Sequence, residues 1–376
     1  MIIIQNGNSL DLLKLREENS IDSCVTDPPY GLVSIVKRFS KTSINDDTQT
    51  SEDARERKTP FSRTSRGFMG NEWDGSGIEY NVDLWKEVYR VLKPGAFLLA
   101  FGGTRTYHRV TCAIEDAGFE IRDCMMWLYG SGFPKSLDIS KQIDKIELGI
   151  HRGKAGKVLS ENGSMSGGNY ERTDKGEPVS DNAKKWNGWG TALKPAWEPI
   201  ILARKPISEK NVALNVLKWG VGGINIDESR IDLDGEIVPI NKLEEWSGFG
   251  QVERPDYVQE INTAGRWPSN LLLDDESSKI VNEQKDGVAR FFYCAKVAKK
   301  EKVGIEHPTM KPVKLMEYLV RLVTPKNGKV LDPFMGSGST GVACKNLDYS
   351  FVGMDIDPKN CDAALKRIND AKEKED

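Results

Sequence analysis

The sequence has few cysteines and histidines and no long apolar segment. Its six cysteines are scattered without a C-x-x-C pair, and there are three histidines, so we expect neither a disulfide scaffold nor a metal centre. The longest apolar run, residues 96–101, is too short to cross a bilayer, and residues 1–6 lack the basic and apolar parts of a signal peptide. With 53 basic and 56 acidic residues the chain lacks a basic excess, although a local basic face would suffice to bind nucleic acid. These absences favour a cytoplasmic globular protein with no membrane segment and no metal.

The 376 residues are 38% apolar, which is enough for a large core, and they alternate between helical and strand-like patterns. The patterns predict strands at 21–26, 96–101, 120–129 and 199–205, and helices at 82–92 and 105–117. A compact C-terminal unit follows, with predicted strands at 329–331 and 351–354 and helices at 339–346 and 358–373. Alternation of this kind predicts an α/β fold built on a sheet.

A glycine-rich segment, residues 332–341, lies between a predicted strand and a predicted helix. Glycines there allow a sharp turn and a close approach to a ligand. Asp355 ends the next predicted strand, where a carboxylate can accept the hydroxyl protons of a ribose. The segment has no lysine, which argues against a phosphate-binding P-loop. The glycine spacing also matches a dinucleotide fingerprint, and a turn without a ligand is the plain alternative. The pattern favours a cofactor of the adenosine type.

A second polar cluster, Asp27-Pro28-Pro29-Tyr30, follows the strand predicted at 21–26. Open α/β sheets bind ligands at the carboxyl ends of their strands. Asp27 and the Pro28 carbonyl can accept the two N–H protons of a planar amine, and Tyr30 can stack on its ring. The alternative is a Pro-Pro turn that does no more than end a strand.

Taken in order along the chain, these motifs resemble the amino-group DNA methyltransferases that depend on S-adenosylmethionine (SAM), in the β arrangement of that family. There the catalytic Asp-Pro-Pro-Tyr comes first, a target-recognition region follows, and the cofactor loop comes last. Residues 307–312, His-Pro-Thr-Met-Lys-Pro, resemble the family motif that precedes the cofactor loop. Residues 193–199 and 265–270 are similar to segments of phage-borne and orphan methylases.

The resemblance implies a Rossmann-like methyltransferase sheet with a circularly permuted motif order and an inserted target-recognition region. The implied parts are a catalytic half at 1–130 with a mobile loop at 35–72, a polar loop with a closing strand at 131–205, a target-recognition region at 206–300, and a SAM-binding half at 301–376. Double-stranded DNA is the implied partner, and a homodimer is left open. A restriction nuclease, if one exists, would be a separate chain.

The resemblance also assigns roles to residues. Asp27, Pro28, Pro29 and Tyr30 are the implied catalytic residues. The implied cofactor residues are Asp332, Pro333, Phe334, Gly336, Ser337, Gly338, Thr340, Asp355, Thr309, Lys311 and Asn8. Asn8 stands where the family usually has Asp, so it would lack the carboxylate that helps to hold the adenine of SAM. Trp127 and Phe133 are candidates to stack on a flipped base, with ordinary core aromatics as the alternative.

The implied reaction is methyl transfer from SAM to the exocyclic N6 of adenine in double-stranded DNA, by base flipping and direct in-line attack. Asp27 favours adenine as the target base, whereas the family's N4-cytosine enzymes tend to carry Ser at that position. The alternatives are an N4-cytosine enzyme, a non-catalytic DNA-binding relative, and an RNA or protein-amide substrate. C5-cytosine chemistry is disfavoured because no cysteine follows a proline. We expect Gly338→Val to block SAM binding by intruding on the cofactor path.

Overall fold

The computed structural model describes most of the chain and divides it into two compact units. Described are residues 1–30, 77–130, 132, 136–152, 176–233, 238–239, 261–262, 264–285, 287–295 and 310–371. The larger unit combines Met1–Gly130 with Trp197–Asp376, and the smaller unit is Ser131–Ala196. The expected loop at 35–72, Phe133 and Thr309 lie outside the described residues.

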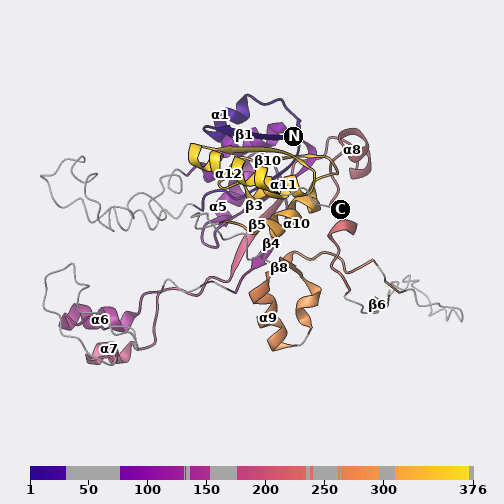
Figure 1. Ribbon diagram of the computed structural model, residues 1–376. Helices are drawn as coiled ribbons and strands as arrows, with labels where there is room; N and C mark the ends of the chain where they lie inside the picture. The colour runs from indigo at the N-terminus through magenta and orange to yellow at the C-terminus, as the bar shows by residue number, and fades with distance from the viewer. Residues whose placement is uncertain are drawn as a thin grey trace, which may run out of the picture. The chain divides into compact units, whose positions relative to one another are not determined.

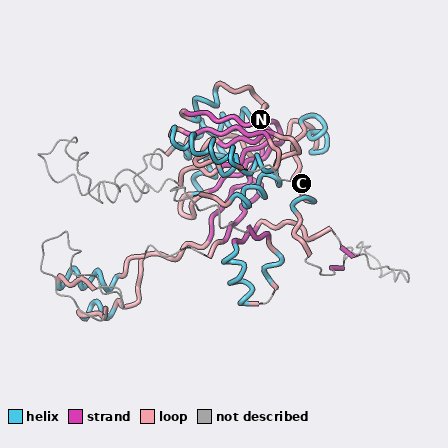
Figure 2. The backbone as a smooth tube through the Cα atoms, in the orientation of Figure 1, coloured by secondary structure: helices cyan, strands magenta, loops and turns pink. Residues whose placement is uncertain are grey.

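A mixed sheet forms the centre of the larger unit (Figure 2). Its nine strands within the described residues run in the order β1 (Ile2–Asn6), β11 (Ser350–Asp355), β10 (Lys329–Asp332), β2 (Ile21–Thr26), β3 (Leu92–Phe101), β5 (Trp197–Arg204), β4 (Glu120–Leu128), β8 (Leu271–Asp274) and β9 (Tyr293–Ala295). Every neighbouring pair is parallel except the two that β5 makes with β3 and β4. A separate short ribbon pairs β6 (Val238–Pro239) with β7 (Ile261–Asn262).

Helices cover both faces of this sheet. On one face lie α10 (Val313–Val323), α11 (Ser339–Asn346) and α12 (Pro358–Asp370), which Figure 1 shows in orange and yellow. On the other lie α1 (Ser9–Lys14), α4 (Val82–Val91), α5 (Tyr107–Asp116) and α8 (Val212–Trp219). Helix α9 (Asp275–Gln284) connects β8 to β9, and short 3-10 turns occupy Ile78–Tyr80, Asp227–Ser229 and Val288–Phe291. The expected α/β fold is confirmed.

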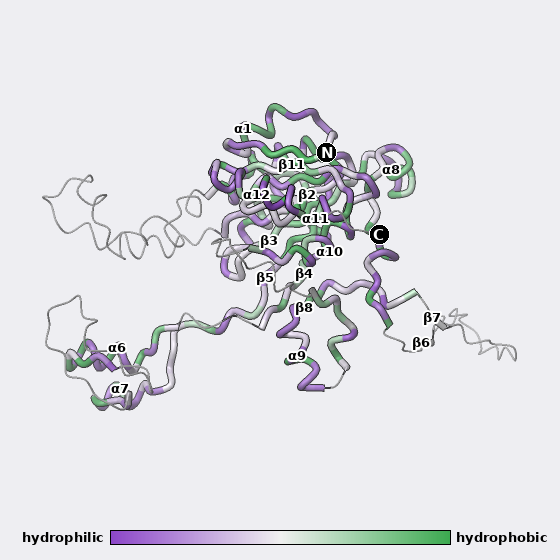
Figure 3. The backbone as a smooth tube through the Cα atoms, viewed as in Figure 1, coloured by the Kyte–Doolittle hydropathy of each residue, from purple (hydrophilic) through white to green (hydrophobic). Residues whose placement is uncertain are grey.

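Two hydrophobic clusters explain why the strands are apolar on both faces. Because side chains alternate along a strand, Leu99 packs into the cluster under α10 and α11, whereas Leu98 packs into the one under α4 and α5. Both leucines are fully buried. Figure 3 shows the same distribution, with hydrophobic colour on strands of the sheet and hydrophilic colour on α9 and α12. A sheet covered on both faces needs near-continuous apolar strands, and that need makes them recognisable in the sequence.

The smaller unit contains two helices where the sequence led us to expect a polar loop. Helix α6 (Ile139–Leu148) is capped by Asp138, which accepts a hydrogen bond from Lys141 N at 3.0 Å, and it ends at Gly149 in the left-handed region. Helix α7 (Asp181–Lys185) packs beside it. An Asp before an apolar turn and a Gly after it are ordinary helix boundaries. The expectation of a loop is therefore corrected for these residues.

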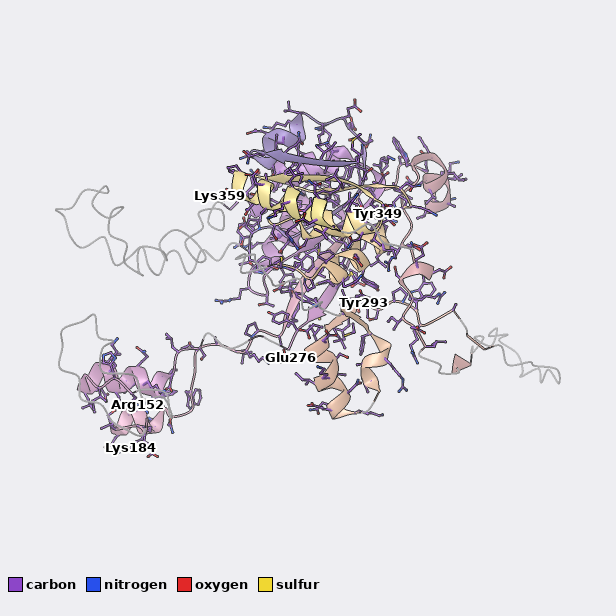
Figure 4. The ribbon with its side chains drawn as sticks, viewed as in Figure 1. Arg152, Lys184, Glu276, Tyr293, Tyr349 and Lys359 are labelled. Atoms are coloured by element: carbon purple, nitrogen blue, oxygen red, sulfur yellow. The ribbon has the colours of Figure 1, made fainter. Side chains whose placement is uncertain are left out.

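A buried ion pair lies inside the smaller unit (Figure 4). The Arg152 Nε atom lies 2.8 Å from Asp144 Oδ2, with both side chains almost fully buried. Burial alone would raise the pKa of Asp144, but hydrogen bonds from Ser180 and Val179 and the Arg152 charge lower it. The pair therefore holds α6 against the chain that leads into α7.

The surface of the smaller unit carries aromatic side chains. Trp186 and Trp189 meet edge to face with ring centroids 5.1 Å apart, and Trp189 is 60% exposed.

Among the residues that the structure describes, no helix is long and apolar enough to span a membrane.

Candidate active site

The site lies where the connections of the sheet change direction. From β10 the chain crosses through α11 to β11, and from β2 it reaches β3 through α4, on the opposite face. In open α/β sheets such a switch point leaves a crevice at the carboxyl ends of the two strands, where ligands bind. Thr26 Oγ1 at the end of β2 donates to Asp332 Oδ1 at the end of β10 over 2.7 Å. This bond joins the two motifs that the sequence singled out.

Asp27, directly after β2, is held by a lysine from the distant end of the chain. Lys311 Nζ lies 2.5 Å from Asp27 Oδ2 and 3.3 Å from Glu198 Oε2. It also donates to the Tyr30 hydroxyl over 3.0 Å, and that hydroxyl donates to Glu198 over 2.9 Å. Lys311 is 6% exposed, so the ammonium is removed from water. Four side chains from three parts of the chain therefore form one hydrogen-bonded cluster.

The second oxygen of Asp27 has a different environment. Asp27 Oδ1 is buried and has no hydrogen-bond partner within the part of the chain that the structure describes. A buried acceptor without a partner is costly, and native proteins retain few of them. The lysine thus engages one oxygen and leaves the other for a donor that the described residues do not supply.

The charges of Lys311 and Glu198 have opposite effects on the pKa of Asp27. Burial raises the pKa of Asp27; the Lys311 ammonium offsets part of the rise, and the Glu198 carboxylate adds to it. Burial alone would lower the pKa of Lys311, but Asp27 and Glu198 outweigh it, so the pKa of Lys311 is raised. Lys311 therefore stays charged, and Asp27 responds to the charges of both neighbours.

Tyr30 is fixed through its backbone as well as its hydroxyl. Its carbonyl oxygen accepts hydrogen bonds from Thr106 Oγ1 at 2.6 Å and from the Tyr80 hydroxyl at 3.4 Å. A Cβ atom at Gly103 would lie 3.3 Å from the tyrosine side chain, so the glycine gives the ring room. The ring that we expect to stack on a base is therefore held in one place.

In the glycine segment, Asp332 has a structural role, because its carboxylate accepts hydrogen bonds from neighbouring residues. The Asp332 carboxylate accepts from Thr26 Oγ1, from Phe334 N at 3.1 Å and from Thr340 Oγ1 at 2.6 Å. Burial raises the pKa of Asp332 to about 6, although these hydrogen bonds oppose the rise. Both carboxylate oxygens are engaged with the protein, and Thr340 faces inward with them. These two predicted cofactor residues shape the loop, and the described contacts do not direct them outward.

Gly338 meets a neighbouring helix. Its φ of +80° is in the left-handed region, and a Cβ atom there would lie 2.7 Å from Ala364 Cβ on α12. The reason given for Gly338→Val is therefore corrected: the new side chain would collide with α12. Arg367 of α12 donates to the Ser337 carbonyl over 2.6 Å, and Ser337 is buried. Helix α12 thus fixes the shape of the loop. Gly336 is also at positive φ, and its backbone N–H donates to Asp355 at the end of β11.

Asp355 and Asn8 lie near the loop at the ends of β11 and β1. Asp355 Oδ2 accepts from Gly336 N at 2.9 Å, and Oδ1 accepts from Asp357 N at 2.8 Å and from Asn360 at 3.1 Å. Burial raises the pKa of Asp355, and these bonds offset part of the rise. An ionised carboxylate offers about four acceptor positions, so Asp355 keeps capacity for further donors.

Asn8 is exposed and caps α1, where its side chain accepts from Leu10 N at 3.0 Å. The next residue, Ser9, donates to the Pro333 carbonyl over 2.5 Å and so joins the start of α1 to the loop. Phe334 packs with its ring centroid 6.3 Å from that of Trp85. The structure thus gathers Asn8, Pro333, Phe334, Gly336 and Asp355 around one end of the sheet.

Of the two aromatic candidates for base stacking, the described residues contain one. Trp127 is 9% exposed and packs in the core cluster with Val25 and Phe101, as the core alternative predicted. Tyr129 points to the same face of β4, is half-buried, and has its ring centroid 5.4 Å from that of Trp127. Burial and the Glu198 charge raise the pKa of Tyr129, while Lys311 lowers it. The charges of Glu198 and Lys311 therefore act on the Tyr129 hydroxyl.

Sequence reasoning missed the parts played by Glu198 and Tyr129 and placed Lys311 with the cofactor. Signals for the first two were present, because Glu198 lies in the segment at 193–199 that resembled other methylases and Tyr129 is the last residue of the strand predicted at 120–129. The described ranges contain no cluster of three or more His, Cys, Asp or Glu that could hold a metal ion.

Comparison with known proteins gives one family. The N6/N4 methyltransferase family model, described as DNA methylase, matches residues 21–366. Type II methyltransferase M.HindIII of Haemophilus influenzae is 27% identical over 374 residues, which covers 97% of this chain and 94% of that protein. Type II methyltransferase M.HpaI of Haemophilus parainfluenzae is 22% identical over 364 residues, or 96% and 73% of the two chains. The solved structure of M1.HpyAVI with SAM aligns over 98% of this chain and 100% of that chain, at 16% identity and a TM-score of 0.41.

Proposed function

Because the chain belongs to the N6/N4 DNA methylase family, whose model spans residues 21–366, we propose that it methylates the exocyclic N6 of adenine in double-stranded DNA. At the level of the family, the chain is a DNA methyltransferase with SAM as its cofactor and a Rossmann-like sheet. The choice of adenine and the roles of individual residues are the proposal.

The observation that carries the proposal is the unpartnered Oδ1 atom of Asp27. An exocyclic amine is a weak nucleophile because its lone pair is delocalised into the ring. An acceptor on each N–H draws the nitrogen toward tetrahedral geometry and so localises the lone pair on it, and Asp27 Oδ1 with the Pro28 carbonyl would supply the two. Asp27 would also be the group of the cluster that accepts the proton that the amine loses. Positioning and electrostatics then supply the rate.

The residues around the glycine loop fit SAM. A carboxylate with unused acceptor positions, Asp355, stands at the end of β11 for the ribose hydroxyls, and the backbone of Phe334–Gly336 runs beside it. Asn8 would face the adenine with an amide in place of a carboxylate. When bound, SAM supplies an electrophilic methyl group. We assign these residues, with Pro333 and Ser337 as loop positions, to the cofactor.

The base must leave the duplex to reach Asp27, because its amine is otherwise paired and stacked. We propose that Tyr30 stacks on the flipped base and that Tyr129 forms the opposite wall. The four hydrogen bonds described above fix Tyr30, and Tyr129 is half-buried and experiences the charges of the same cluster. The two rings would also exclude water from the amine.

The test is methyl transfer from labelled SAM to unmethylated double-stranded DNA, followed by digestion to nucleosides. Label in N6-methyladenine is the expected result. Label in N4-methylcytosine would be consistent with the proposed active site but would contradict adenine as the target base. Bound SAM without transfer to any DNA, in a preparation that contains all sequences of the recognised length, would contradict the enzymatic proposal.

The named relatives are Type II methyltransferases, and we propose that this chain likewise modifies sites that a separate nuclease would cut. The scattered cysteines and a DNA substrate favour the cytoplasm as its compartment. Pairing of two copies stays a prediction.

A further inference from the structure

Lys311 is enclosed by two carboxylates, and the substrate amine needs only one of them. Its ammonium lies 2.5 Å from Asp27 and 3.3 Å from Glu198, with 6% of the residue exposed. Glu198 has no assigned part in methyl transfer. It comes from β5, the antiparallel strand, whereas Asp27 follows β2, and β3 lies between those two strands in the sheet. Two carboxylates from separate strands thus converge on one buried cation.

The geometry makes the orientation of Asp27 depend on this cation. An ion pair removed from water is much stronger than an exposed one, and removal of one partner leaves an uncompensated buried charge. The contact of Lys311 with Oδ2 restricts rotation of the carboxylate about its Cβ–Cγ bond, and it leaves Oδ1 buried without a partner among the described residues. Glu198 forms a second ion pair with the same cation, and it also accepts a hydrogen bond from the Tyr30 hydroxyl.

We propose that Lys311 and Glu198 are positioning residues that together fix the Asp27 carboxylate with Oδ1 toward the substrate amine and fix the Tyr30 ring beside it. The inference rests on the proposed methyl transfer. Neither residue touches the reacting atoms in this proposal. Lys311 acts through Asp27, and Glu198 acts through Lys311 and Tyr30.

The two residues should affect Asp27 in opposite directions. The titratable groups that face the cluster are Tyr30, Tyr129 and Asp332, besides Lys311 and Glu198. Lys311 lowers the pKa of Asp27 and Glu198 raises it. Methyl transfer needs Asp27 ionised, so the acid limb of the pH–kcat profile follows this pKa. Loss of the cation should move the limb to higher pH, and loss of the Glu198 charge should move it to lower pH.

The experiment compares K311M, E198Q and the double variant with the unaltered protein. We expect K311M to lower kcat roughly 100-fold, the cost of misplacing a reacting group. We expect E198Q to lower it less, by roughly tenfold. In the double variant the like-charge repulsion between Asp27 and Glu198 is gone, so it should be about tenfold more active than K311M. The SAM dissociation constant should stay within about twofold throughout.

Matched controls come from a solvent-accessible lysine–glutamate ion pair, formed by Lys218 of α8 and by Glu209, which precedes that helix. Lys218 Nζ lies 2.6 Å from Glu209, and α8 packs near Pro94, at the end of β3 away from Asp27. K218M and E209Q should change neither kcat nor the acid limb. Thermal unfolding and SAM titration of every variant separate loss of folding from loss of positioning. If K311M fails to fold, E198Q with its shift to lower pH tests the inference alone.

Opposite shifts of the acid limb, with partial rescue in the double variant, would support the inference. Acid limbs that stay in place in both single variants, or a double variant as impaired as K311M, would overturn it while the proposed function stands. Absence of transfer by the unaltered protein would overturn the proposed function and this inference with it.

Discussion

At the scale of single residues, the two oxygens of the Asp27 carboxylate differ in what they contact. Oδ2 is paired with Lys311, and Oδ1 is buried without a partner among the described residues. Asp27→Ala removes both, so kcat should fall at least roughly 100-fold, as for loss of one preorganised polar group. Calorimetric SAM affinity should be unchanged, because the hydrogen bond and ion pair that Asp27 makes within the described residues go to Lys311 and not to the glycine loop.

Asp27→Asn is the matched variant for this prediction. It keeps an oxygen acceptor and loses the charge, so its kcat should lie between those of the unaltered protein and Asp27→Ala. Equal loss of methyl transfer and SAM binding in Asp27→Ala would contradict the part given to this residue.

Trp127 of β4 and Tyr129, directly after the strand, give a second prediction at this scale. Tyr129→Ala should reduce kcat/KM for DNA by roughly 10- to 100-fold, since stacking of an aromatic ring on a base contributes about 1–3 kcal/mol. Tyr129→Phe keeps the ring and should be nearly as active as the unaltered protein. Trp127→Ala should instead lower the free energy of unfolding by about 3–5 kcal/mol, because Trp127 is in the core. Steady-state kinetics and denaturant unfolding distinguish the two residues; a Tyr129→Ala variant with intact kcat/KM would refute the stacking role.

Asp332 gives a prediction about pH. Its pKa is raised from 3.8 to about 6, mainly by burial, so the folded protein binds a proton between those values that the unfolded chain does not. Stability from this group is therefore present below about pH 4 and is lost as pH rises through 6, a difference of about 3 kcal/mol. In Asp332→Asn, the unfolding free energy should depend less on pH between 4 and 6 than in the unaltered protein. Parallel curves for the two proteins would contradict the shift.

At the scale of elements, α12 packs closely against the loop that begins α11. Gly338 is at φ +80° with Ala364 of α12 where its Cβ would be, so Gly338→Ala should destabilise the protein by about 1–3 kcal/mol. Ala364→Gly in the same chain should restore part of that loss, because it removes the collision and leaves the backbone strain. Denaturant unfolding and SAM titration measure both. If Ala364→Gly does not raise the unfolding free energy of the Gly338→Ala variant, the destabilisation does not come from a collision with Ala364.

The elements themselves were largely predictable from the sequence. The strand predicted at 21–26 and the helix at 339–346 match β2 and α11, because buried strands and a glycine-to-helix boundary leave local patterns. The ion pair of Asp27 with Lys311 leaves no such pattern, since 284 positions separate the residues. Their contact depends on the order of strands in the sheet. The helices at 139–148 and 181–185 were missed because polar tracts around them masked short capped turns.

At the scale of the whole molecule, the smaller unit is inserted in the connection of a hairpin. Leu128 of β4 and Trp197 of β5 are direct partners in the sheet, and residues 131–196 run between them. A hairpin connection needs about two to five residues, so a short glycine-containing turn could replace the insertion. The shortened protein should keep its thermal midpoint within a few degrees and its SAM affinity.

DNA affinity of the shortened protein should fall at least roughly tenfold, because exposed aromatic and lysine side chains such as Trp189 and Lys184 are lost with the insertion. Fluorescence titration with duplex DNA measures this. Loss of SAM binding or aggregation would show that the larger unit depends on the insertion for folding.

The place of β10 in the sheet also constrains synthesis of the protein. This strand lies between β11 and β2, and it begins at Lys329 of 376 residues. A ribosome therefore releases β1 and β2 long before the strands that separate them. Until β10 and β11 emerge, the nascent chain exposes strand edges and the apolar surfaces that α10 to α12 will cover. The sheet can be completed only after β10 and β11 have been synthesised, and a chain that stops before β10 has neither the complete sheet nor a cofactor loop.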